Sequence, residues 1–103
     1  MKKPERDPKL DFLFNAILTI QDLDECYEFF EDLCTVSELQ EMSRRLVAAR
    51  MLMSGQIYSE IAEQTGLSTA TISRVNKCLK YGNEGYIKAL ERVEYREKAA
   101  RRK

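Results

Sequence analysis

Apolar side chains recur every three or four residues through most of this sequence, the spacing that places them on one face of an α-helix. The first stripe follows Asp7 and Pro8, a pair typical of a helix start because the carboxylate caps backbone N–H groups and proline needs no partner there. It consists of Leu10, Leu13, Phe14, Ile17 and Leu18. No segment alternates strictly between apolar and polar residues, as a half-buried strand does. The pattern therefore predicts an all-α fold of about six helices.

Capping residues mark where the next helices begin. A second helix is expected from Asp22, with Glu25 as its capping-box partner. A third is expected from Thr35, which pairs with Glu38 in the same way. It should end before Gly55, because glycine tolerates the left-handed conformation common at helix C-termini.

Two shorter helices are expected over residues 58–65 and 69–80, separated by a turn at Gly66. Ser68 is placed to cap the second of them, and Asn83 to cap a last helix.

Length and composition favour one domain, because 103 residues with 44% hydrophobic and 33% charged residues suit a single core. We expect an N-terminal tail over residues 1–9, a single domain over residues 10–93 and a charged C-terminal tail over residues 94–103, which frays or projects into solvent. The longest apolar run covers only residues 46–49, so neither a membrane span nor a membrane partner is expected. Polar residues directly after the N-terminal lysines argue against a secretory signal, so we expect a cytoplasmic location.

The net charge of zero hides a strong asymmetry. Residues 1–41 hold eleven acids and four bases, whereas residues 42–103 hold six acids and thirteen bases. Such a chain has one part that repels polyanions and another that attracts them. Charge alone leaves two interpretations open, nucleic-acid binding and a helical protein with unevenly solvated faces.

The sequence lacks the residue patterns that catalysis or metal binding would need. Histidine is absent, and Cys26, Cys34 and Cys78 lack metal-type spacing, so we expect reduced, mostly buried thiols. No phosphate-binding loop, activated nucleophile or calcium loop is present. The sequence therefore predicts a protein that is not an enzyme and holds no metal or cofactor.

Residues 58–77 fit a helix-turn-helix. Ala62 is small where the two helices approach, and Gly66 supplies the positive φ of the turn four residues later. Leu67 fills the turn from the inside. The remaining inward positions are taken by Ile61, Ile72 and Val75.

The outward positions of the second helix are small, polar or basic, which suits insertion into the major groove of DNA. Lysines there can neutralise phosphates, and hydroxyl groups can donate to them. Two other interpretations stay open: a plain helical corner whose hydroxyls face water, and a tyrosine ring that packs instead of reaching a phosphate. The predicted DNA-binding residues are Tyr58, Ser59, Ser68, Thr69, Ala70, Thr71, Ser73, Arg74, Lys77 and Lys80.

These motifs together resemble the Trp repressor family. The similarity spans roughly residues 10–93. Its main segments are Leu33-Cys34-Thr35-Val36-Ser37-Glu38-Leu39, Arg44-Arg45 and Ala70-Thr71-Ile72-Ser73-Arg74. The resemblance implies an intertwined homodimer whose paired recognition helices read a palindromic operator in double-stranded DNA. A dimer would also cover the surplus apolar surface of the first two helices.

The resemblance further implies a ligand pocket, in which tryptophan lies between two arginines. Arg45 and Arg74 match these arginines, and Thr35 matches a polar pocket residue. Val75 replaces a glycine beside the indole, and Cys78 replaces a serine that receives the amino group. Because the valine side chain takes the space of the ring, we expect no tryptophan cofactor, and the effector, if any, is unknown. The alternative is that Val75 is an ordinary inward position of the helix-turn-helix, and we favour this structural role over a ligand contact.

We therefore predict a sequence-specific DNA-binding transcriptional regulator that acts as a repressor. The alternative is a helical dimer that does not bind DNA and serves as a protein–protein interaction module through its acidic face.

Overall fold

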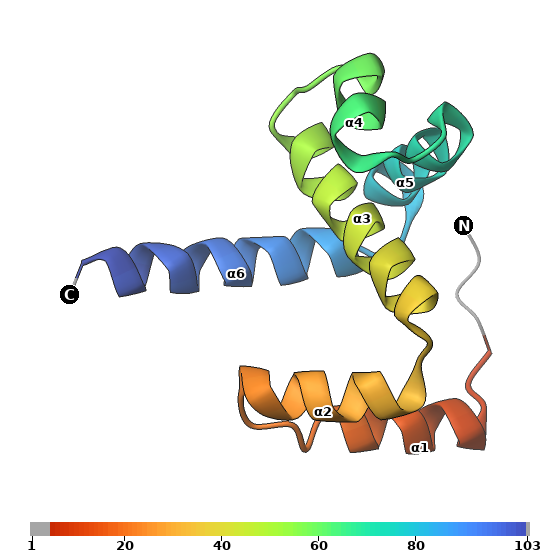
Figure 1. Ribbon diagram of the computed structural model, residues 1–103, viewed down its shortest axis with the longest axis vertical. Coiled ribbons are helices and arrows are strands. Elements are labelled where there is room, and N and C mark those ends of the chain that lie inside the picture. The colour runs from red at the N-terminus through yellow and green to blue at the C-terminus, as the bar shows by residue number, and fades with distance from the viewer. Residues whose placement is uncertain (1–4, 103) are drawn as a thin grey trace. The chain divides into compact units, whose positions relative to one another are not determined.

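The computed structural model describes residues 5–102, which form six α-helices and no strand (Figure 1). This confirms the predicted all-α class and the number of helices. In chain order they are α1 (Pro8–Ile17), α2 (Leu23–Leu33), α3 (Val36–Met53), α4 (Tyr58–Thr65), α5 (Thr69–Tyr81) and α6 (Gly85–Arg101). Close contacts divide the chain into two compact units at Met42, inside α3. The single domain predicted over residues 10–93 stays a prediction.

The amino-terminal unit contains α1, α2 and the beginning of α3 as far as Glu41, and each of these helices starts at its predicted cap. Asp7 accepts a hydrogen bond from the Lys9 N–H at 2.8 Å, and Asp22 accepts one from the Glu25 N–H at 2.9 Å. The Glu25 carboxylate accepts from the Gln21 N–H at 3.2 Å, one residue earlier than a capping box requires. The caps therefore hold as predicted, but the second box is closed one residue upstream.

At the start of α3, Thr35 and Glu38 form the complete capping box. The Thr35 N–H donates to the Glu38 carboxylate at 2.9 Å, and the Glu38 N–H donates to the Thr35 hydroxyl at 3.1 Å. The hydrogen bond from the Thr35 backbone, and after it the one from the Thr35 side chain, lowers the pKa of Glu38 below its ordinary value.

No side chain of α1 or α2 is buried. Large apolar side chains are exposed on both helices, among them Phe12 at 78% and Phe14 at 53% on α1 and Leu23 at 71% on α2. This matches the surplus of apolar surface expected from the sequence.

The carboxyl-terminal unit, described from Met42 to Arg102, holds the buried core. One cluster joins Ala48 and Met51 of α3 to residues of α4, α5 and the turn between them. A second joins Ala49 of α3 to Val75 of α5 and Leu90 of α6. Because Ala48 and Ala49 are small and fully buried, α3 is approached closely on two adjacent sides. This helix is therefore the support on which α4, α5 and α6 are placed.

The joint between α5 and α6 differs from the prediction. The residue before α6 is Glu84, which has a φ of +64° and makes no capping hydrogen bond with its side chain. The prediction that Asn83 caps this helix is wrong, because the left-handed turn at Glu84 moves the helix start one residue further along. By contrast Gly55, after α3, has the predicted left-handed φ of +85°.

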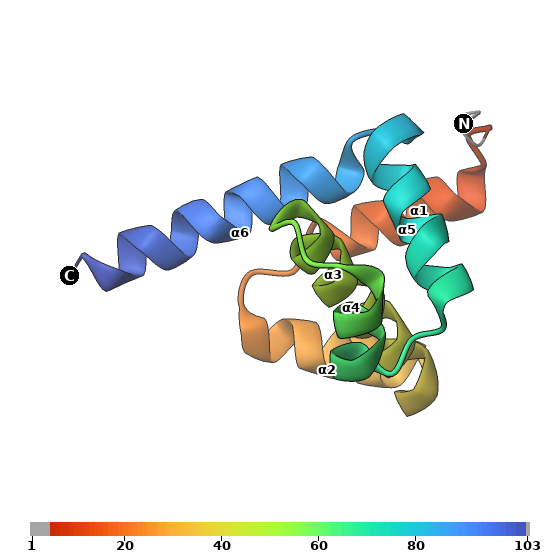
Figure 2. The ribbon, with the colours of Figure 1, turned by 90° about the horizontal axis from the view of Figure 1, so that it is seen from above.

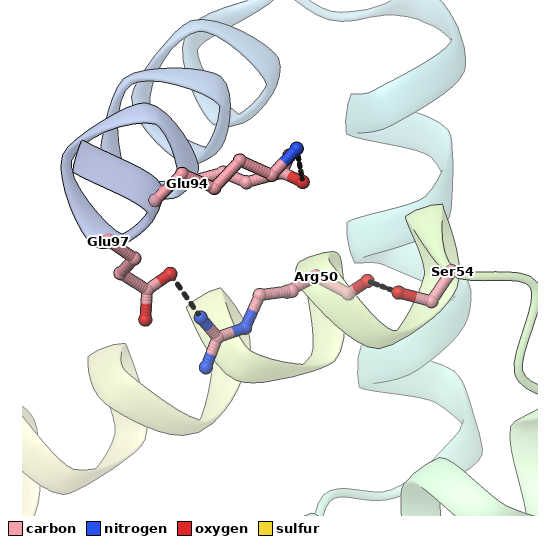
Figure 3. Close-up of polar contacts among 5 residues, drawn as sticks. Arg50, Ser54, Glu94 and Glu97 are labelled. Atoms are coloured by element: carbon pink, nitrogen blue, oxygen red, sulfur yellow. Dashed lines mark hydrogen bonds and ion pairs between the residues drawn. The ribbon is translucent and has the colours of Figure 1, made fainter. Parts of the chain in front are cut away.

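Helix α6 continues through residues 94–101, which the sequence assigned to a charged tail. Arg50 Nη1 lies 3.6 Å from Glu97 Oε1, and Lys98 Nζ lies 3.2 Å from Glu94 Oε1 (Figure 3). All side chains from Glu91 to Arg102 are exposed.

Candidate nucleic-acid interface

The motif expected to bind DNA consists of α4, the turn over residues 66–68 and α5 (Figure 2). Helix α4 ends at Gly66, whose φ of +76° is left-handed and whose N–H donates to the Ala62 carbonyl at 2.9 Å. A side chain at this position would oppose that conformation, so glycine is what lets the chain reverse here. The predicted positive φ is confirmed.

Thr65 adds a second restraint on the turn that the sequence did not reveal. Its side chain is 9% exposed, and its hydroxyl donates to the Ile61 carbonyl at 2.7 Å. The same oxygen accepts from the Leu67 N–H at 3.2 Å. A threonine in the last turn of a helix, directly before a glycine, is the signal that could have indicated this local bonding.

Packing holds the two helices at their crossing. Ile61 and Ile72 are fully buried, and Leu67 and Val75 are 6% and 2% exposed. Ala62, at the predicted close approach, packs against the same cluster as Ile61. The inward positions predicted for the helix-turn-helix are therefore buried, and the opposite side of α5 is left to face outward.

Helix α5 is started by Ser68, as predicted. The Ser68 hydroxyl accepts from the Thr71 N–H at 3.1 Å and donates to the Thr71 hydroxyl at 3.0 Å. The Thr71 hydroxyl therefore keeps its own proton for an external acceptor.

None of the residues predicted to bind DNA is buried. Tyr58, Thr71 and Ser73 are half-buried, and the exposed members are Ser59, Ser68, Thr69, Ala70, Arg74, Lys77 and Lys80. Helix α5 contains no acid. Its cations form no ion pair within residues 5–102, where the ion pairs are Arg6–Asp11, Arg50–Glu97 and Lys98–Glu94. The outward face of α5 is consequently a surface of small, hydroxyl and uncompensated basic side chains.

Tyr58 is also bonded within the motif. The Asn76 side-chain amide donates to the Tyr58 hydroxyl oxygen at 3.0 Å, which joins the first residue of α4 to α5. The Tyr58 ring packs against the cluster around Ile61. The ring packing left open at the sequence level is thus present, and the sequence contained no signal for the Asn76 partner.

The residues predicted for a ligand pocket have very different surroundings. Thr35 lies in the amino-terminal unit and is engaged in the α3 capping box. Arg45 is half-buried, Arg74 is exposed, and Val75 is buried against Ala49 and Leu90. Cys78 lines an open cavity of about 340 Å³ between α5 and α6, together with Gly82, Asn83, Gly85, Tyr86 and Ala89. Of the candidates in the carboxyl-terminal unit, only Cys78 lines this cavity.

Cys26, Cys34 and Cys78 are half-buried, and none of them is part of a disulfide. Among residues 5–102, no cluster of three or more potential ligands could hold a metal ion. No helix in the same range is long and apolar enough to cross a membrane.

The structure thus has two helices held together by buried side chains, a turn at a left-handed glycine, and a second helix whose outward face is basic. These features define the helix-turn-helix class of proteins. The chain belongs to the Trp repressor protein family, whose model matches residues 8–94. The resemblance inferred from the motifs is therefore confirmed. This is a family of DNA-binding regulators, not of enzymes.

Relatives of known sequence or structure agree with this assignment. The chain is 57% identical over 88 residues to the uncharacterized protein YerC of Bacillus subtilis strain 168, which covers 85% of each chain. A crystal structure of a Trp-repressor-like protein from Eubacterium eligens ATCC 27750 is 50% identical with a TM-score of 0.83, covering 86% of this chain and 92% of that one. A candidate Trp repressor from Staphylococcus aureus is 49% identical with a TM-score of 0.82, covering 86% and 89%.

Proposed function

We propose that this protein is a sequence-specific DNA-binding transcriptional regulator that represses by occupying a promoter. The observation that carries the proposal is the outward face of α5, where Arg74, Lys77 and Lys80 stand without acidic partners on a helix held by a buried core. Family membership supports the same function. Repression of this kind needs no chemical step, because it is enough that the protein occupies the promoter.

The residues of α5 and its neighbours in the motif contact two parts of the DNA, the phosphates and the base edges. Lys77 and Lys80 neutralise phosphates, which gives affinity that falls steeply with salt but does not depend on sequence. Thr69, Ala70, Ser73 and Arg74 reach base edges, where each good contact is worth about 1–3 kcal/mol of discrimination. Ser59, Ser68 and Thr71 add hydroxyl groups to the phosphate contacts.

We further propose that the protein acts as a homodimer on a palindromic operator. The exposed apolar side chains of α1 and α2, such as Phe12 and Leu23, are a reason for a second copy to cover them. Two copies would present two recognition helices to successive major grooves. A regulator of this kind works beside DNA, so the expected cytoplasmic location remains part of the proposal.

Tryptophan is not proposed as the corepressor. Val75 is 2% exposed and packs with Ala49 and Leu90, so its side chain already occupies space inside the core. Any effector would have to bind elsewhere or through a different pocket. Selection of bound duplexes from a random pool, repeated with candidate amino acids and nucleotides, tests for such an effector and yields the operator and its symmetry.

Gel-shift titration across a salt series tests the proposal itself. The wild-type protein should bind duplex DNA with an affinity that falls steeply as salt rises, whereas an interaction module that only uses the motif as a scaffold should shift no duplex. Lys77→Ala should weaken binding to every sequence and reduce the salt slope by about one. Arg74→Ala and Ser73→Ala should instead change the preference among sites. Lys98→Ala, in the Glu94 ion pair on α6, is the matched control with the same change of charge.

A further inference from the structure

The hydrogen bond between Asn76 and Tyr58 joins two helices at a point remote from their turn. Tyr58 is the first residue of α4 and Asn76 lies in the second half of α5, so the two residues are separated by 18 positions in the chain. At about 1.5 Å of rise per residue, each lies about 10 Å along its helix from the turn. Hydrogen bonds thus restrain the motif at two places. Those of Thr65 and Gly66 lie at the turn, and the Asn76–Tyr58 bond lies at the open end, which is the end of the helix pair away from the turn.

A second hydrogen-bonded contact restricts a relative motion of the two helices that the turn alone would allow. A helix pair joined only at its turn can open and close about that turn, and the displacement grows with distance along the helices. The hydrogen bond from the Asn76 amide is directional. Because it is partly buried, water competes less well for the amide and for the Tyr58 hydroxyl than it would at an exposed site. The bond therefore sets the spacing between the start of α4 and the middle of α5.

The residues beside this bond are those assigned to DNA. Ser59 follows Tyr58, while Ser73 lies one helical turn before Asn76 and Lys77 directly after it. Both sides of the bond thus carry groups that must meet one duplex at the same time. An error in their relative position affects base contacts more than phosphate contacts, because bidentate base contacts demand tighter geometry than charge neutralisation.

We propose that Asn76 and Tyr58 form a positioning pair that fixes the open end of the helix-turn-helix for sequence-specific DNA recognition. This inference rests on the proposed function. It assigns Tyr58 a role through Asn76 and α5 instead of an independent phosphate contact, and it gives Asn76 a role that its sequence position did not indicate.

A double-mutant cycle with Tyr58→Phe and Asn76→Ala tests the pair. Tyr58→Phe keeps the ring that packs on the core and removes only the acceptor, while Asn76→Ala removes the donor and favours the helix. Binding is measured on a duplex selected by the wild-type protein and on a duplex of unrelated sequence, below the unfolding temperature of every variant. Tyr86→Phe, a half-buried tyrosine of α6, is the matched control.

Each single variant should raise the Kd for the selected duplex about tenfold and the Kd for the unrelated duplex by less than about threefold, and the double variant should bind no worse than the weaker single variant. A purely structural bond would lower the unfolding temperature and leave both Kd values unchanged, which overturns the proposal. Two other outcomes also overturn the proposal. One is weaker DNA binding in only one of the two single variants, and the other is an equal rise in Kd on both duplexes. In either case the substituted residue contacts DNA on its own.

The outcome for the wild-type protein separates this inference from the proposed function. If the wild-type protein shifts no duplex at any salt concentration, the DNA-binding function fails and the positioning role fails with it. If the wild-type protein binds and both variants bind equally well, only the positioning role is wrong.

Discussion

Replacing Gly66 by alanine isolates the conformational cost of the helix-turn-helix turn. Gly66 has a φ of +76°, and a Cβ built there meets no atom within 4 Å. Since there is no steric clash, the cost comes only from holding an L-residue in the left-handed region, about 1–2 kcal/mol. Alanine also restricts the unfolded chain, which returns about 0.4–1 kcal/mol. We expect Gly66→Ala to lower the free energy of unfolding by about 1 kcal/mol.

Two other glycines provide controls for this reasoning. Gly85 is the first residue of α6, its φ is not positive, and its Cβ position is also open. Gly85→Ala should therefore raise the free energy of unfolding by about 0.4–1 kcal/mol. Gly82 has a φ of −85°, but an added Cβ would collide with the Cys78 carbonyl oxygen, so Gly82→Ala should destabilise through a clash instead of through backbone strain.

Urea unfolding followed by helical circular dichroism gives the three free energies, and all variants need the same protein concentration in case they associate. For a domain of this size, 1 kcal/mol corresponds to a shift in Tm of roughly 4–8 °C. Gly66→Asn should recover part of the loss, because asparagine tolerates the left-handed region. If Gly66→Ala is as stable as the wild-type protein, or if Gly85→Ala loses as much as Gly66→Ala, the conformational reasoning is refuted.

Three further perturbations test the core, the α6 joint and the α3 cap. Ile72→Ala should lower the free energy of unfolding by about 2–5 kcal/mol because Ile72 is 0% exposed, whereas Val93→Ala, at 42% exposure, should cost much less in the same urea experiment. Glu84→Gly should stabilise the protein by up to about 1 kcal/mol in thermal unfolding, since glycine relieves the φ of +64°; a loss of Tm would contradict this. Because hydrogen bonds from Thr35 lower the pKa of Glu38, the carboxylate stabilises the fold above the ordinary value of 4.5, and this contribution is lost as the pH falls through the lower folded-state pKa. Glu38→Gln should therefore flatten the acid limb of a stability–pH profile, and an unchanged acid limb would argue against the assignment.

The helix starts were predictable because a cap acts over only two or three residues. Asp7, Asp22, Thr35 and Ser68 each accept the hydrogen bond that the local sequence indicated. The same reasoning failed at Asn83, because the chain turns through Glu84 in the left-handed conformation, and glutamate is not a residue whose presence indicates that conformation.

The candidate interface was also predictable in outline. The inward and outward sides of α5 follow from its 3.6-residue period, so the burial of Ile72 and the exposure of Arg74 and Lys77 agree with the pattern. What the pattern could not supply is the partner of each polar group. The bond between Asn76 and Tyr58 and the two bonds of the Thr65 hydroxyl depend on where the helices lie after folding.

The six helices, the helix-turn-helix and the charge difference between the two parts of the chain could be predicted from the residues alone, because periodicity, caps and composition act within one helical turn or over whole segments. Three contacts became known only from the folded chain: Val75 packs with Ala49 and Leu90, Arg50 lies beside Glu97, and Asn76 donates a hydrogen bond to Tyr58. These contacts join residues far apart in the chain. They depend on which side chains meet when α3, α4, α5 and α6 pack, and no local pattern encodes that meeting.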